Sequence, residues 1–181
     1  MPSYVALLRG VNVGKAKRVP MAELRDVLAV LGCTHVATLL NSGNVVFRSR
    51  TRSASACATA IAAALADRFG FEVPVVVKSF RELAVIIAGN PLRFTEADHS
   101  RLLVAFVQDA GQLASLRKIE SLVVSPEQFA ICSDAAYLLC ASGLLASKAG
   151  AALIGAAGRT VTTRNWATVL KLQAMALSTS A

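Results

Sequence analysis

A cluster of basic residues and glycines follows the first apolar segment, and its composition suits the binding of an anion. The cluster lies in LLRGVNVGKAKRVP, residues 7–20. Glycine lets a backbone approach a ligand closely, and a helix beginning near Pro20 would present free N–H groups and a positive dipole end. A solvated turn without a ligand is the alternative interpretation. The candidate anion-binding residues of this loop are Arg9, Gly10, Asn12, Gly14, Lys15, Lys17 and Arg18.

The spacing within this loop does not fit the P-loop of nucleotide-binding proteins. A P-loop needs four residues between its glycines, and then Lys followed by Ser or Thr as a metal ligand. Here three residues separate Gly10 from Gly14, and Ala16 follows Lys15. The chemistry expected at this loop is therefore the binding of an anion without a magnesium–nucleotide motif.

A second candidate site lies near the C-terminus, in TTRNWATV. We expect Arg164, Asn165 and Trp166 in the first turn of a helix, with Thr163 as the N-cap. A helix start of this composition could bind an anion or stack a base against the indole. In the alternative interpretation, Trp166 anchors the helix in the core and Arg164 pairs with a carboxylate.

The expected strand arrangement brings further cations to the first loop. Arg48, Arg50 and Arg52 follow the third predicted strand. If the first and third strands are parallel neighbours, these arginines share an edge with Arg9 and its loop, so seven cations are expected to converge. The NSGN turn, residues 41–44, would then lie at the opposite edge and serve only as a turn.

Signatures of catalysis and of metal binding are sparse in the sequence. It has no GxSxG elbow and no HExxH motif. The two histidines, His35 and His99, and four cysteines without a CxxC pair provide no obvious zinc ligand set. We therefore expect no metal and no cofactor, and it stays open whether the protein is an enzyme.

Composition and charge indicate a folded, basic protein. Of the 181 residues, 55% are hydrophobic and 17% charged, and the net charge is +8, of which residues 1–66 contribute +6. Such a charge attracts phosphate-bearing partners, although it could also serve solubility alone. No apolar run is long enough to span a bilayer and no signal peptide is evident, so we expect no membrane association. Buried, reduced thiols and a cytoplasmic location are expected from the four cysteines, Cys33, Cys57, Cys132 and Cys140.

Hydrophobic periodicity predicts an α+β protein made of two similar subdomains, 1–90 and 91–181. Each has the β-α-β-β-α-β order of the ferredoxin-like unit, with antiparallel or mixed sheets and helices on one face. The first half contains strands at 4–10, 34–40, 45–50 and 71–78, helices at 20–31 and 53–69, and a third helix opened by a Ser79–Glu82 capping box. The second half contains strands at 101–109, 127–132, 135–140 and 159–163 and helices at 111–121, 143–158 and 164–177.

Three stretches of the sequence resemble signature stretches of the domain-of-unknown-function 1697 family of mostly bacterial proteins. These are LLRGVNVGKAKRVPMAEL, LNSGNVVF and TTRNWATVLKLQAM, and the resemblance runs from Tyr4 to about Met175. The family usually has two glycines before the basic residue of the first loop, and here Lys15 takes the place of the second. The resemblance implies two ferredoxin-like subdomains, and it implies no activity.

Three functional hypotheses remain open at this stage. The first is a binding module for an anionic, phosphate-bearing ligand, with nucleic acid among the candidates. The predicted strand aromatics Tyr4, Phe47, Phe71 and Phe129 do not form an RNA-recognition-motif pattern, which argues against sequence-specific RNA binding. The second is a small-molecule enzyme acting on an anionic substrate in a cleft between the subdomains. The third is a scaffold or homo-oligomer without a ligand.

Overall fold

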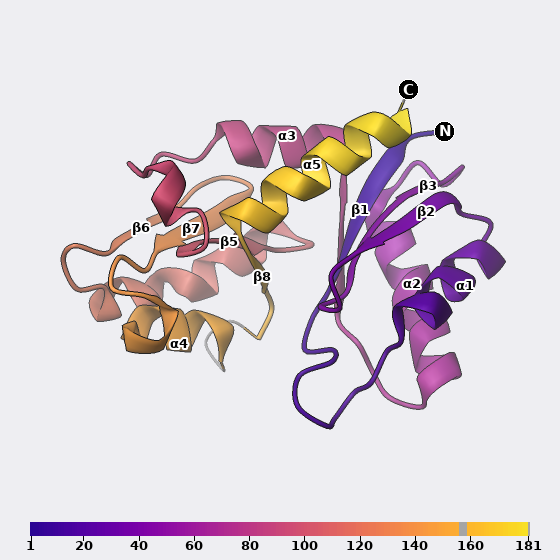
Figure 1. The fold of residues 1–181 in the computed structure, drawn as a ribbon, viewed down its shortest axis with the longest axis horizontal. Helices are drawn as coiled ribbons and strands as arrows, with labels where there is room; N and C mark the ends of the chain where they lie inside the picture. The colour runs from indigo at the N-terminus through magenta and orange to yellow at the C-terminus, as the bar shows by residue number, and fades with distance from the viewer. Residues whose placement is uncertain (156–158, 181) are drawn as a thin grey trace. The chain divides into compact units, whose positions relative to one another are not determined.

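The computed structural model describes residues 1–155 and 159–180, which form two four-stranded antiparallel sheets with helices (Figure 1). The α+β class expected from the sequence is therefore confirmed. The chain divides into two compact units, one of residues Met1–Ala84 with Leu172–Ala181 and one of residues Val85–Lys171. The division falls within two helices, α3 (Phe80–Ala88) and α5 (Trp166–Ser180).

The first unit has the element order β-α-β-β-α-β that the sequence predicts. Its sheet has the order β2-β3-β1-β4. Both β2 and β4 lie at edges, and every neighbouring pair in the sheet is antiparallel. The elements are β1 (Ser3–Leu8), α1 (Met21–Val30), β2 (Thr34–Leu39), β3 (Asn44–Arg48), α2 (Ala54–Phe69) and β4 (Val75–Ser79).

The core of the first unit lies between the sheet and helices α1 and α2. Side chains alternate along a strand, so Tyr4, Ala6 and Leu8 of β1 point to the same face. They belong to one cluster of buried residues with Leu24 of α1 and Ile61 of α2. The other face of β1 is buried as well, so β1 is the apolar, doubly buried strand that its sequence suggests.

The helix ends of the first unit follow the capping chemistry of the sequence. The Ser53 hydroxyl accepts a hydrogen bond from the N–H of Ala56 at 3.1 Å, and α2 ends at Gly70 in the left-handed conformation. At the start of α3 the Ser79 N–H donates to Glu82 Oε2 at 2.7 Å, and the Glu82 N–H donates to Ser79 Oγ at 3.2 Å. The predicted Ser79–Glu82 capping box is thus confirmed.

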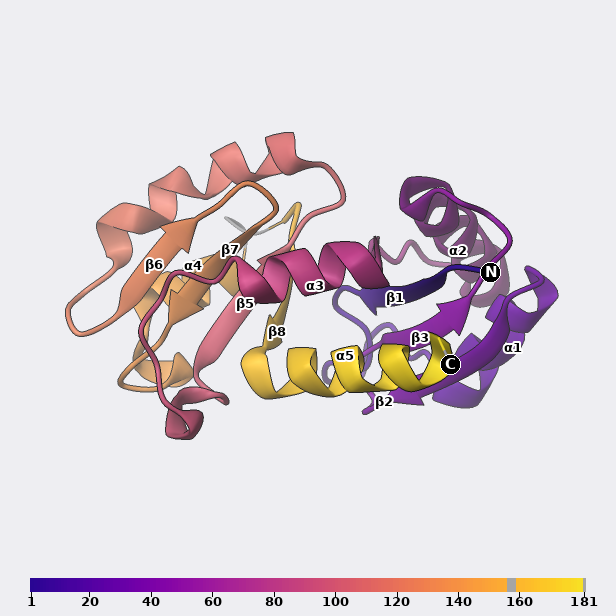
Figure 2. The ribbon, with the colours of Figure 1, turned by 90° about the horizontal axis from the view of Figure 1, so that it is seen from above.

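The second unit contains a sheet of order β6-β7-β5-β8, again antiparallel at every pairing. Figure 2 shows the helical segment η2 running along the β6–β7 hairpin. Its core joins alternate residues of β5 and β7 to the apolar face of η2, through Leu103, Leu138, Leu116 and Ile119. The elements are η1 (Glu96–Asp98), β5 (Leu102–Phe106), η2 (Ala110–Leu122), β6 (Gln128–Ile131), β7 (Ala135–Leu139), η3 (Leu144–Ala146), α4 (Lys148–Ile154) and β8 (Thr162–Asn165).

The helix predicted at 111–121 is present in the second unit as a 3-10 helix, η2. The helix predicted at 143–158 is shorter, because Ser147 caps a new helix there: its hydroxyl accepts from the N–H of Gly150 at 2.9 Å, so α4 begins at Lys148 and the preceding turn is η3. The last residues of that prediction, 156–158, lie outside the described residues.

Tyr137 of β7 provides a test of the core of the second unit at alkaline pH. Its buried hydroxyl donates to the Ile86 carbonyl at 2.5 Å. Burial raises the pKa of the phenol, and the charges of nearby Cys132 and Asp134 raise it further. The unfolded chain ionises near pH 10 while the folded chain keeps this proton, so stability is lost as pH rises above that value. Between pH 8 and 11 the loss from this residue should be on the order of 1 kcal/mol.

The test compares Tyr137→Phe with the wild-type protein in urea unfolding at several pH values. The variant should start about 1 kcal/mol less stable because the Ile86 carbonyl loses its donor. It should then lose less stability than the wild type above pH 10. Parallel pH profiles would show that Tyr137 ionises as readily in the folded chain as in the unfolded chain.

Candidate functional site

The basic loop between β1 and α1, residues 9–20, has a backbone that departs repeatedly from the usual conformation. Gly10, Asn12, Gly14 and Lys17 all have positive φ, from 49° to 69°. A Cβ atom built on Gly10 or Gly14 would meet nothing within 4 Å. These two glycines are therefore required by backbone conformation and not by a close neighbour. In Figure 1 the loop hangs from the end of β1 as the dark indigo segment.

Asn12 holds this loop closed. Its Oδ1 accepts from the Val19 N–H at 2.9 Å, and its Nδ2 donates to the carbonyls of Val19 at 2.9 Å and Asn41 at 2.6 Å. The Asn12 backbone N–H donates to the Lys17 carbonyl at 3.1 Å. The side-chain amide is thus fully engaged within the protein, so Asn12 shapes the site and does not offer free donors to a ligand.

The NSGN turn lies beside the basic loop, and the expectation that it lies at the opposite edge is wrong. The Leu8 N–H donates to the Gly43 carbonyl at 2.8 Å, and Asn41 accepts from Asn12. A Cβ atom on Gly43 would lie 2.6 Å from Leu8 Cβ and 2.9 Å from Val11 Cγ2. Among the described glycines of the first unit, Gly43 is the one at which a neighbouring chain segment approaches closely.

The arginines after β3 do not join the loop, and the predicted convergence of seven cations is wrong. The pairing of β1 with β3 is antiparallel, with Ser3 opposite Arg48 and Leu7 opposite Asn44. Arg48 therefore lies at the start of β1, where its Nε donates to the Met1 carbonyl at 3.2 Å, about 16 Å of strand away from the loop. The strands that run parallel are β1 and β2, with β3 between them, and β3 and β4, with β1 between them.

The cations of the loop itself have different surroundings. Arg9 is partly buried and its backbone N–H donates to the Pro74 carbonyl at 2.9 Å. The Lys17 ammonium donates to the Glu72 carbonyl at 3.0 Å. Lys15 and Arg18 are exposed, and within the described residues their side chains make no hydrogen bond or ion pair. Two positive charges therefore remain available to a ligand at this loop.

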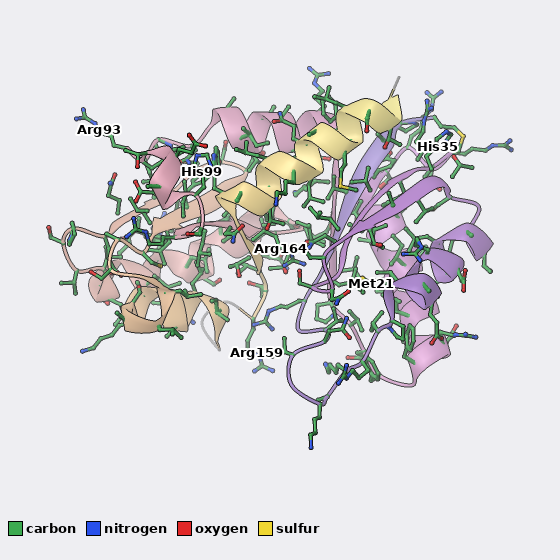
Figure 3. All side chains as sticks on the ribbon, in the orientation of Figure 1. Met21, His35, Arg93, His99, Arg159 and Arg164 are labelled. Atoms are coloured by element: carbon green, nitrogen blue, oxygen red, sulfur yellow. The ribbon has the colours of Figure 1, made fainter. Side chains whose placement is uncertain are left out.

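A pocket of about 310 Å³ lies between the loop, the NSGN turn and the start of α1. The N-cap residue of α1, Pro20, supplies no side-chain hydrogen bond to the first turn of the helix. The backbone N–H groups of that turn are thus uncapped at the end of α1 where the dipole is positive. Figure 3 shows Met21 at this helix start. The pocket is lined by Asn12, Arg18, Val19, Pro20, Met21 and Asn41.

The second candidate site, at residues 164–166, is built differently from the prediction. Thr163 and Arg164 lie on β8, paired with β5, and not in a helix. The helix α5 begins at Trp166, and Asn165 caps it through Oδ1, which accepts from the Thr168 N–H at 2.9 Å. The expectation of Thr163 as the N-cap and of Arg164 in the first helical turn is therefore wrong.

Arg164 and Trp166 have inward-facing roles in the second unit. The Arg164 guanidinium donates to Thr162 Oγ1 at 2.9 Å and to the Thr163 carbonyl at 2.7 Å, and burial lowers its pKa to about 10. The Trp166 indole is buried and packs edge-on against Phe94, with ring centroids 5.3 Å apart. A buried indole offers no face for stacking a base, so the core-anchor interpretation describes Trp166.

The comparison with protein families agrees with these observations. A family model described as a protein of unknown function, DUF1697, matches residues 1–137, more than half of the chain. The chain belongs to the DUF1697 family. Within this DUF1697 chain the matched residues include the basic loop, the NSGN turn and the whole first sheet. Residues 164–166 lie beyond the match.

A solved structure supports the same fold for this DUF1697 protein. The chain is similar to the solved structure of the conserved bacterial protein SP0830 from Streptococcus pneumoniae, with 25% identical residues and a TM-score of 0.74. The similarity covers 97% of this chain and 98% of that one. No curated protein matches the sequence.

The cysteine thiols of this DUF1697 chain lie in environments that lower their reactivity. All four cysteines are free, and burial raises the pKa of each thiol. A raised pKa keeps a thiol protonated, which makes it a poor nucleophile.

In residues 1–155 and 159–180, no group of three or more His, Cys, Asp or Glu side chains is placed to hold a metal ion. No described helix has the length and apolar character needed to cross a membrane.

Sequence reasoning missed one component of the loop site, the turn residue Asn41. Its contribution is a backbone carbonyl, which has no signature in side-chain chemistry. The only available signal was the β1–β3 register, because an antiparallel pairing places the start of β3 next to the end of β1.

Proposed function

We propose that the edge of the first unit formed by the basic loop binds a small, phosphate-bearing anion. The observation that carries the proposal is the pocket of about 310 Å³ that is lined by Arg18 and by the uncapped start of α1. Backbone N–H groups at a helix start and a guanidinium are the donors that proteins use for phosphate. The Asn12 bonds fix the backbone at Val19, between Arg18 and the start of α1, before any ligand arrives.

A compact anion fits this edge better than a nucleic acid. The strand aromatics of the first unit, Tyr4 and Phe47, stack on each other in the core and are 2% and 0% exposed, so they offer no platform for bases. Seven of the eight cations of residues 1–66 are divided between the two ends of the sheet, and the eighth, Arg25, is on α1, which shortens any track for a phosphate backbone. A single phosphate group needs only the donors around one pocket.

The test is calorimetric titration of inorganic phosphate, AMP and a short single-stranded RNA into the wild-type protein and Arg18→Ala. The variant should bind the preferred phosphate ligand about tenfold or more weakly, because a hydrogen bond to a charged group is lost. The matched control is Arg50→Ala, which removes an exposed arginine at the other end of the sheet and should leave the affinity unchanged.

Salt separates the proposed ligand classes. Affinity for a compact anion should change little between about 50 and 300 mM NaCl, whereas RNA contacting several phosphates should lose affinity with a log–log slope of roughly −0.7 per phosphate. Binding of RNA alone, with that steep slope, would replace the small-anion proposal. Equal affinity of the wild type and Arg18→Ala for every probe would contradict the assigned site.

We also infer a reducing compartment, such as the cytoplasm, for this protein. The support is that all four cysteines are free thiols, two of them in the interior of the units. Structural disulfides form in oxidising compartments. The proposed function is binding, with no reaction assigned.

A further inference from the structure

A groove on the first unit, separate from the anion pocket, lies between helices α1 and α2. It encloses about 470 Å³. Val27, Val30 and Ala64 give it apolar walls, and Val30 is 88% exposed. An exposed apolar wall rimmed by polar side chains is typical of a contact surface.

The rim of the groove is acidic on a protein that is otherwise basic. Residues 1–71 contain only three carboxylates, Glu23, Asp26 and Asp67, and all three line the groove. Glu23 is paired with Arg68 at 2.8 Å, whereas Asp26 and Asp67 make no ion pair within the described residues. The groove therefore carries two uncompensated negative charges beside an apolar wall.

A surface of complementary chemistry lies on the same unit, at the tip of the basic loop. Val13 is 71% exposed there, and Lys15 is exposed without a partner among the described residues. The tip thus offers an apolar side chain and a nearby cation, the counterparts of Val30 and of Asp26 and Asp67. The Asn12 bonds tie the loop to the NSGN turn, so the loop cannot leave that edge to fill the groove of its own chain.

We propose that the Val13–Lys15 tip of one molecule docks in the α1–α2 groove of a second copy. The two surfaces are different parts of the chain, so the contact is heterologous and joins molecules head to tail. One loop tip in a groove of this volume is a small interface, and such interfaces are weak and transient. The association should therefore appear at high protein concentration and decrease with salt.

The experiment is sedimentation equilibrium of the full chain and of two charge variants. Asp26→Lys/Asp67→Lys changes the groove and leaves the loop intact. Val13→Asp/Lys15→Glu changes the loop tip and leaves both the groove and Arg18 intact. Each variant alone should be monomeric at concentrations at which the wild type associates, with the dissociation constant raised about tenfold or more. Glu96→Lys/Glu120→Lys, a matched charge change on the second unit, should associate like the wild type.

Mixing the two variants gives the decisive result. The intact loop of the groove variant can dock in the intact groove of the loop variant, and neither can add a third molecule. A mixture should therefore form one-to-one dimers with the affinity of a single wild-type contact, while each variant alone stays monomeric. Monomeric behaviour of the wild type at low salt, or a mixture that remains monomeric, would overturn the proposal.

Two further results would also overturn it, and the test is independent of the proposed anion site. Association unchanged by the groove variant would place the contact elsewhere. Capture of a lysine-rich peptide by a groove that does not self-associate would make the occupant another protein. Because the groove variant leaves the whole basic loop intact, phosphate titration of that variant reports on the anion pocket separately.

Discussion

Replacement of Gly43 by alanine is expected to lower the free energy of unfolding by about 2–4 kcal/mol. Two effects combine at this position. The backbone has φ +77°, which L-residues other than glycine adopt at a cost, and the new Cβ would lie 2.6 Å from Leu8 Cβ and 2.9 Å from Val11 Cγ2. Neither neighbour can move easily, because Leu8 is on the central strand β1 and both are buried in the core. Urea unfolding followed by circular dichroism measures the change.

Gly70→Ala is the matched control for this prediction. Gly70 has a similar φ, +74°, but a Cβ atom there would meet nothing within 4 Å. Its substitution should cost about 1 kcal/mol, the conformational part alone. If the two variants were equally destabilised, the close approach of the NSGN turn to β1 would contribute nothing.

Replacement of Asn12 by alanine is expected to lower the free energy of unfolding by about 2–3 kcal/mol. The substitution removes three side-chain hydrogen bonds at once, two to the backbone of Val19 and one to the carbonyl of Asn41. Val19 is fully buried, so its N–H and carbonyl would be left without partners away from water. Chemical unfolding gives the total loss, and amide exchange at Val19 shows where it arises.

Two variants separate the contributions at Asn12. Asn12→Gly also removes the hydrogen bonds but tolerates the positive φ of 57°, so it should be less destabilised than the alanine variant by about 1 kcal/mol. Asn41→Ala removes a side chain that takes no part in the Asn12 hydrogen bonds, since only the Asn41 carbonyl accepts the bond from Asn12. An Asn12→Ala protein as stable as Asn41→Ala would show that the Asn12 side chain does not hold the loop closed.

The fold could be predicted largely because local signals agree with tertiary packing in both units. The apolar run of β1, the capping box at Ser79 and Glu82, and the stop at Gly70 are each visible in a few neighbouring residues. The second unit was harder, since Ser147 begins a helix inside a stretch whose alanines and leucines favour one continuous helix. A single side-chain cap outweighed the helix propensity of the sequence there.

The candidate site was predictable only in its local part. The glycines and cations between residues 9 and 18 are adjacent in sequence, and the structure keeps them in one loop. The placement of Arg48 depended on the direction of β3 relative to β1, and an incorrect parallel assignment moved it by the length of a strand. At residues 162–165 pairing with β5 extends the strand through Asn165, and Asn165 in place of Thr163 caps α5.

The hydrogen bond from Asn12 to Asn41 also determines when the site can form as the chain folds. The two residues are 29 positions apart, and the Asn41 carbonyl reaches the loop only when the β2–β3 hairpin has docked on β1. Closing such a long segment is slow compared with forming a helical turn. In a nascent chain that ends before residue 41, the basic loop therefore lacks the hydrogen bond from Asn12 to Asn41 that helps to fix its conformation. The proposed anion pocket is consequently a late product of folding, and an anion bound there would stabilise completely folded molecules over partly folded ones.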